Sequence, residues 1–93
     1  MPKNRESKEF SELTVFVFNH KKDEYLIKYS SGKTITALFE AAYEDDNELD
    51  VYDPQYEYFT SLVFENTSTG DLFELNYHDL PNIEVYHNGK RIV

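Results

Sequence analysis

Short runs of β-branched and aromatic residues, separated by turn-forming residues, recur along most of this chain. The segment Leu72-Phe73-Glu74-Leu75-Asn76-Tyr77 alternates apolar and polar side chains, which is the pattern of a strand with one buried face. We expect strands at residues 13–18, 24–29, 58–65, 72–77 and 83–87, the first of them a central strand covered on both faces. Asn88-Gly89 is a strong hairpin signal that leads into a last short strand.

One segment between the predicted strands has the period of a helix. Its apolar side chains fall at i, i+3, i+4, i+7 and i+8, and they are Ile35, Leu38, Phe39, Ala42 and Tyr43. Thr34 is the expected N-cap, and the helix is expected to end near residues 45–47. The sequence therefore predicts an α+β fold of order ββαββ(ββ), with a mostly antiparallel sheet packed by one helix.

This predicted order resembles the β-grasp or ubiquitin-like arrangement over residues 13–93. A hairpin, one packing helix and further strands carry the resemblance, which is one of topology and size. The chain ends Arg91-Ile92-Val93, without the Gly-Gly that conjugated members of that group use, so conjugation is not expected.

The length of 93 residues predicts one domain with one hydrophobic core. Residues 1–10 are polar and are expected to form a flexible segment, while residues 11–93 form the domain with an acidic loop at 44–57. The longest apolar run, residues 15–18, is far shorter than the roughly 20 residues of a membrane span, and no signal peptide is evident. We therefore expect no membrane partner and a cytoplasmic location. The absence of cysteine excludes disulfides, zinc knuckles and thiol chemistry.

Charge is distributed unevenly along the chain, whose net charge is -9. The 56 residues from Thr34 to Gly89 contain no Lys or Arg but thirteen Asp and Glu, so this segment carries a charge of -13. A chain of this charge is not expected to bind nucleic acid or anionic membrane directly, because both are negative. It is expected to bind cations or basic proteins.

Catalytic and cofactor motifs are not evident. His20, His78 and His87 lie at predicted turns or strand ends, with no spacing typical of a metal pair, and we expect each to be a surface histidine. The chain has no nucleophile elbow and no Gly-rich phosphate loop. We therefore expect a protein that is not an enzyme and uses no cofactor.

A calcium-binding loop is a more specific metal hypothesis than a site built on the histidines. A twelve-residue loop that begins at Asp46 has oxygen donors at the spacing of an EF-hand, at positions 1, 3, 5 and 12. Position 6, however, is Val51 where the turn requires Gly, and position 9 is Pro54. The sequence therefore predicts no specific metal site, and a weak Ca²⁺-binding module is only a third hypothesis.

The most informative segment is residues 44–57, where seven carboxylates are interleaved with tyrosines. Acids at the C-terminal end of the predicted helix would oppose its dipole, at about 0.3–1 kcal/mol each, and such local conflicts are typical of functional sites. Tyrosine beside carboxylate is a combination that protein interfaces use. The candidate binding residues are Glu44, Asp45, Asp46, Glu48, Asp50, Tyr52, Asp53, Tyr56 and Glu57, with Tyr52 and Tyr56 as anchors.

We hypothesise a small acidic protein that docks on a basic protein, in particular one whose nucleic-acid site it blocks by imitating DNA. Small acidic inhibitors of restriction, CRISPR or transcription proteins, often encoded by phages, are similar to this chain in size and charge. An extended segment with one acid per two residues has a charge every ~6.6 Å, against ~3.4 Å for a DNA strand. Mimicry would therefore need further acids on the same face, from Glu65, Asp71, Glu74, Asp79 and Glu84, or a second protomer in a homodimer. The alternative is an adaptor or scaffold that binds through its sheet.

Overall fold

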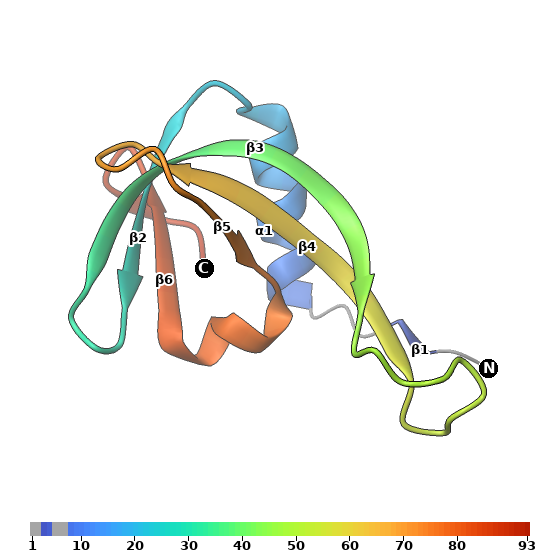
Figure 1. Cartoon of the computed structure of the whole chain (residues 1–93). Helices are drawn as coiled ribbons and strands as arrows, with labels where there is room; N and C mark the ends of the chain where they lie inside the picture. The colour runs from blue at the N-terminus through green and yellow to red at the C-terminus, as the bar shows by residue number, and fades with distance from the viewer. Residues whose placement is uncertain (1–2, 5–7) are drawn as a thin grey trace.

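The helix of this protein precedes the hairpins, and the strands that follow form one strongly curved sheet (Figure 1). The computed structural model describes residues 3–4 and 8–93. The elements in chain order are β1 (Lys3–Asn4), α1 (Lys8–Asn19), β2 (Glu24–Tyr29), β3 (Thr34–Asp46), β4 (Glu57–Asn66), β5 (Leu72–Leu75), the 3₁₀-helix η1 (Tyr77–Asn82), β6 (Ile83–His87) and β7 (Lys90–Arg91).

The sheet has the strand order β1-β4-β3-β2-β6-β7, and β5 also pairs with β4. Every pair is antiparallel except β1 with β4, which is parallel. The two longest strands, β3 and β4, pair from Ala37 with Asn66 to Asp46 with Tyr58. The expected α+β fold, with one helix on a mainly antiparallel sheet, is confirmed. The pairing of β3 with β4 carries residues 44–57 away from the core (Figure 1).

Helix α1 forms because its buried side chains repeat at i, i+3 and i+7. Phe10, Leu13 and Val17 are fully buried against the sheet, whereas Val15 on the outer face is 62% exposed. The Thr14 hydroxyl donates to the Phe10 carbonyl oxygen at 2.9 Å, which satisfies this β-branched polar residue inside the helix. Burial of each apolar side chain of this size contributes roughly 1.5–3 kcal/mol to the stability of the folded state. This packing outweighs the modest helix propensity of Val and Phe.

The prediction of a strand at residues 13–18 was wrong, because this segment lies within α1. The helical period is apparent only when Phe10 is included, and Phe10 had been assigned to the flexible segment. Residues 8–10 belong to the helix, so the folded domain includes them. The expected flexibility of residues 1–2 and 5–7 concerns positions outside the described residues.

The prediction of a helix from Thr34 was also wrong, and a β-bulge explains the misleading pattern. Residues 34–46 form β3, in which Ile35, Ala37 and Phe39 alternate into the core. The pairing register with β4 shifts between Phe39 and Ala41, so the next residue on the core face is Ala42. The spacing of three between Phe39 and Ala42 imitates a helix. With the helix before the first hairpin, the order ββαββ(ββ) is incorrect and the β-grasp arrangement is not supported.

The later elements follow the expectations from turn chemistry. Strands β2, β4 and β6 lie where they were predicted, and Asn88 and Gly89 have φ angles of 51° and 79° in the turn between β6 and β7. Strand β5 ends at Leu75, two residues earlier than predicted. Asn76 then caps η1, accepting a hydrogen bond from the His78 backbone amide at 2.9 Å.

The helices described in this structure are short. Among the described residues, none has both the length and the apolar character that a bilayer crossing requires.

Candidate functional site

The acidic hairpin, defined here as residues 44–57, lies at one end of the molecule beyond the core (Figure 1). Glu44 to Asp46 end β3, Glu57 begins β4, and residues 47–56 connect the two strands. The structure therefore brings all nine predicted binding residues into one projection. Glu44 to Asp46 end a strand and not a helix, so they oppose no helix dipole.

The connecting loop is held by its own side chains. Four side-chain oxygens accept a hydrogen bond from the backbone amide two residues ahead, a pattern that stabilises tight turns. The pairs are Asp46 with Glu48 at 2.8 Å, Asn47 with Leu49 at 3.4 Å, Asp50 with Tyr52 at 2.8 Å and Asp53 with Gln55 at 2.8 Å. Asp46, Asp50 and Asp53, which were predicted to pair with basic groups, thus also hold the loop in shape.

Two further contacts close the loop across its width. The Asn47 side-chain amide donates to the Gln55 carbonyl oxygen at 2.8 Å, and the Tyr56 hydroxyl donates to Asp46 Oδ2 at 3.4 Å. Partial burial raises the pKa of Tyr56, and the charge of Asp46 and the hydrogen bond between Tyr56 and Asp46 raise this pKa further. Tyr56, the second predicted anchor, is half-buried within the hairpin.

The tip of the hairpin presents apolar surface among the carboxylates. Tyr52 is 92% exposed, Val51 is 50% exposed and Leu49 is 40% exposed. Sequence reasoning identified Tyr52 but missed Leu49 and Val51, although two aliphatic residues within an acidic loop were a signal. An exposed apolar cluster surrounded by charge is typical of an interaction site.

A second row of acids continues from the hairpin along the sheet face opposite α1. Glu74 pairs with Val63, and Glu65 is two residues further along β4, so both carboxylates share this face. Tyr43 lies on it too, and its hydroxyl donates to Glu74 Oε1 at 2.5 Å. This hydrogen bond, before any other cause, raises the pKa of Tyr43 to about 12.

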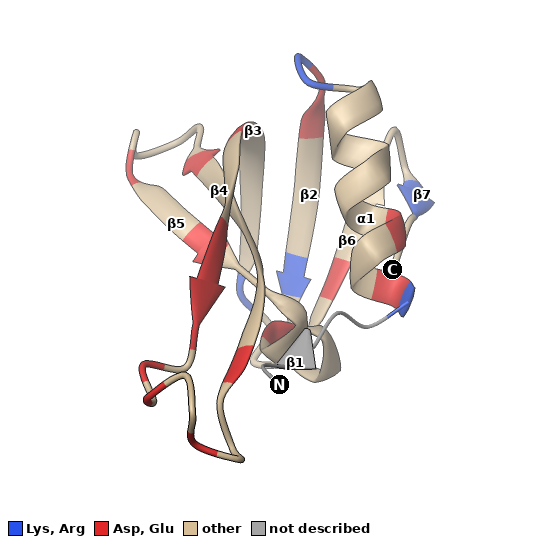
Figure 2. Ribbon diagram, turned by 90° about the vertical axis from the view of Figure 1, so that its right-hand side faces the viewer, with Lys and Arg blue, Asp and Glu red and all other residues tan. Residues whose placement is uncertain are grey.

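Two of the other acids that mimicry might have used, Asp79 and Glu84, have partners elsewhere in the domain. The Asp79 carboxylate accepts a hydrogen bond from the Asn76 backbone amide at 2.9 Å, which is part of the cap of η1. The Glu84 carboxylate lies 3.6 Å from Arg91 Nη1 and accepts a hydrogen bond from the Tyr86 hydroxyl at 2.5 Å. This hydrogen bond lowers the pKa of Glu84. Figure 2 shows acids without bases over the hairpin and the β3–β5 side, whereas α1, β2 and β6 carry acids near the bases of α1, β2 and β7.

Comparisons with known proteins do not place this chain in a group. No family model, no curated protein and no solved structure matches it.

Glu57 occupies the base of the hairpin rather than its tip. Its Oε1 atom accepts a hydrogen bond from the Tyr77 hydroxyl at 2.7 Å and lies 3.2 Å from His78 Nε2. These contacts connect the start of β4 with η1. Glu57 thus fixes where the hairpin leaves the domain, a position that the sequence alone did not indicate.

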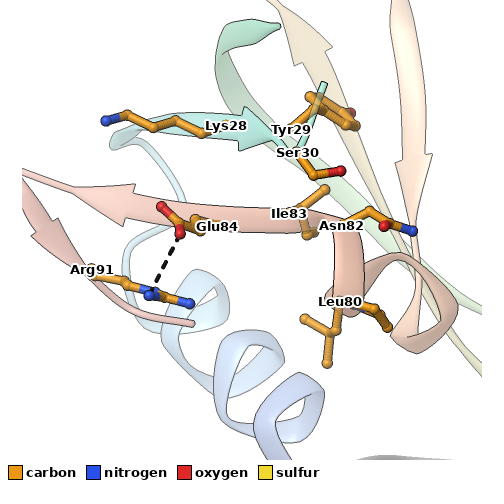
Figure 3. Close-up of a pocket in the computed structure, with 9 residues that line it drawn as sticks. Lys28, Tyr29, Ser30, Leu80, Asn82, Ile83, Glu84 and Arg91 are labelled. Atoms are coloured by element: carbon orange, nitrogen blue, oxygen red, sulfur yellow. Dashed lines mark ion pairs between the residues drawn. The ribbon is translucent and has the colours of Figure 1, made fainter. Parts of the chain in front are cut away.

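The basic side of the molecule contains a shallow pocket of about 280 Å³ between the end of β2, η1 and β6 (Figure 3). Lys28 and Arg91 lie on either side of Glu84, whose carboxylate offsets part of their charge (Figure 3). The Lys28 ammonium lies 4.8 Å from the centroid of the Tyr86 ring. These bases already have partners within the domain, so they leave the charge of the hairpin uncompensated.

Two histidines that were expected to be separate surface residues lie together. The His20 and His87 ring centroids are 5.0 Å apart, and His20 stacks on Phe16 at 4.1 Å. Within residues 3–4 and 8–93 there is no group of three or more His, Cys, Asp or Glu side chains placed to hold a metal ion. In the loop 46–57, which has the spacing of a calcium site, the Asp46 and Asp50 carboxylates accept hydrogen bonds from backbone amides of the loop.

Proposed function

We propose that this chain is a small acidic binding protein that docks on a basic protein surface through the acidic hairpin. The observation that carries this proposal is the exposed Tyr52 at the tip of a loop held by its own hydrogen bonds. In the complex, Tyr52 enters a pocket of the partner, with Leu49 and Val51 beside it. The carboxylates around the tip pair with Lys and Arg at the rim of that pocket.

The internal hydrogen bonds of the loop favour such an interaction. A loop that is already ordered loses less conformational entropy on binding than a loop that must be ordered by its partner. Tyrosine supplies a large contact area with few rotatable bonds, which is why it is frequent among the residues that dominate binding energy. Within the described part of the chain, the Glu44 and Glu48 carboxylates accept no hydrogen bond, so they are available for cations.

The partner surface that fits best is a nucleic-acid-binding groove of a protein, which the hairpin occupies in place of phosphates. Folding residues 44–57 into a hairpin brings its seven carboxylates closer together than an extended segment would, because residues 47–56 turn back between the ends of β3 and β4. A closer spacing favours imitation of a DNA strand, which carries one charge per ~3.4 Å.

A capture experiment tests the proposal. The full chain is immobilised and incubated with cell lysate at low salt, and bound proteins are eluted by a salt step and identified by mass. We expect a basic, nucleic-acid-binding protein whose association weakens steeply with salt and is reduced by added DNA. The Tyr52→Ala variant and the double variant Glu48→Gln/Asp50→Asn should lose most of the binding.

A matched control separates the hairpin from net charge. The double variant Glu9→Gln/Glu12→Gln removes the same charge from the exposed face of α1 and should bind as the wild type does. An equal loss of partner binding in the two double variants, or a complex that is insensitive to salt, would contradict the proposal.

A sheet-binding adaptor is the alternative function, and one observation favours it. The sheet face opposite α1 carries the half-buried side chains of Leu26, Leu38 and Tyr86. If the sheet binds the partner, Leu26→Arg should abolish capture while Tyr52→Ala leaves it intact. The hairpin proposal predicts the opposite result.

A further inference from the structure

The two edges of β4 are covered differently. One edge pairs with β3 along nearly the whole strand. On the other edge, β5 pairs only with residues 62–65, and the chain's own β1 pairs with Glu57 and Tyr58. The start of β4 therefore has an edge that β5 does not reach and that accepts a strand from another part of the chain.

The segment on this edge is basic and its surroundings are acidic. Lys3 pairs in register with Glu57, and Asn4 pairs with Tyr58, which in turn lies opposite Asp46 on β3. Residues 1–8 contain three of the nine Lys and Arg residues of the chain, whereas the adjoining hairpin contains none. Charge complementarity thus accompanies the backbone pairing at this edge.

We propose that the edge of β4 at Glu57–Tyr58 is a strand-addition site for an extended basic segment of the partner protein, which displaces β1. Added strands obtain affinity from backbone hydrogen bonds and specificity from alternate side chains. The segment that fits runs parallel to β4 and carries a basic residue at the position that pairs with Glu57, as the chain itself does at Lys3. This inference deepens the proposed function and rests on it for the identity of the occupant.

The short length of β1 makes exchange feasible. In the described part of the chain, β1 comprises Lys3–Asn4 and pairs with β4 at two positions, so a longer segment of the same charge would compete with it. In the free protein β1 covers the acidic edge, and in the complex the partner segment replaces it at the base of the hairpin. Tyr52 and this edge would then be two contacts of one interface.

The experiment uses the full chain and a fluorescent peptide with the sequence of residues 1–8, MPKNRESK, as the probe. The Lys3→Glu variant places two carboxylates opposite each other at the register position of Glu57, which disfavours pairing of β1. Fluorescence anisotropy at low salt should show that this variant binds the peptide about two- to fivefold more tightly than the wild type does. The control Lys8→Glu makes the same change of charge on α1 and should bind the peptide as the wild type does.

The location of binding is measured by NMR. The peptide should shift the amide signals of Glu57 and Tyr58, and a peptide with Lys3→Glu should not bind. Equal affinity for all three proteins, shifts confined to residues 47–56, or no binding would overturn the proposal. Because Tyr52→Ala should leave peptide affinity unchanged, failure of this site can be distinguished from failure of the hairpin tip in the capture experiment.

Discussion

His87 Nε2 lies 2.7 Å from Asp23 Oδ2, and this contact joins β6 to the turn that precedes β2. The His87 ring also packs edge-on against Phe16 of α1, with ring centroids 4.9 Å apart. The cluster therefore connects the C-terminal part of the helix with the sheet. Its position explains why a histidine near the chain's last hairpin is largely buried.

The first prediction concerns this cluster. His87→Ala should lower the free energy of unfolding by about 2–3 kcal/mol, because it removes buried ring surface and the contact with Phe16. Asp23→Asn should cost less than about 1 kcal/mol, since Asp23 is half-exposed and Asn retains an acceptor. Urea denaturation at pH 7 measures both values. Similar losses in the two variants would show that the contact with Asp23, rather than ring packing, is decisive.

The second prediction tests the helical assignment of residues 13–18. Leu13→Ala should destabilise the protein by about 2–5 kcal/mol because Leu13 is fully buried. Val15→Ala should change stability by less than about 0.5 kcal/mol because Val15 lies on the outer face of α1. Thermal unfolding of the two variants gives the comparison. A strand buried on both faces would instead make the two substitutions similarly costly.

The third prediction is a loss of stability at alkaline pH. Burial, and secondarily the charge of Asp23, raises the pKa of Tyr25 to about 12, whereas the ordinary value is 10.0. The folded state therefore holds the phenolic proton more tightly than the unfolded state does. The contribution of Tyr25 is fully present below pH ~10 and is lost as the pH rises toward ~12.

Tyr25→Phe provides the check for this alkaline effect. The variant should be less stable at pH 8, because the hydroxyl no longer donates to the His20 carbonyl oxygen at 3.2 Å. Its stability should then fall less than that of the wild type between pH 10 and pH 12. Urea denaturation across this range would contradict the assignment if both proteins lost the same amount.

The fourth prediction concerns the turn between β6 and β7. Gly89→Ala should cost about 1 kcal/mol because Gly89 has a φ angle of 79°, which disfavours a side chain. Asn88→Gly should be nearly neutral, since Asn88 has a φ angle of 51° and glycine adopts this region readily. Amide hydrogen exchange in residues 85–91 provides a local readout. Faster exchange in both variants would indicate that the Asn88 side chain also holds the turn.

Several elements were predictable because their signals are local. The alternation in β2 and β6, the Asn88-Gly89 turn and the polar break at residues 66–71 each depend on neighbouring residues. The composition of the acidic hairpin, including Tyr52, was equally evident in the sequence. The roles of Tyr56 and Glu57 were not predictable, because each is set by a contact with a residue distant in the chain, Asp46 and Tyr77 respectively.

The sequence by itself determined that this chain forms an α+β domain with an acidic segment free of bases. Only the tertiary structure decided which segment is the helix and which carboxylates face outward. Phe10 to Val17 are helical because their i, i+3 and i+7 positions cover the sheet, and Ile35 to Ala42 are a strand because a bulge lets both halves reach the core. In each case the burial of side chains against distant strands outweighed local propensity, which differs by less than about 1 kcal/mol per residue.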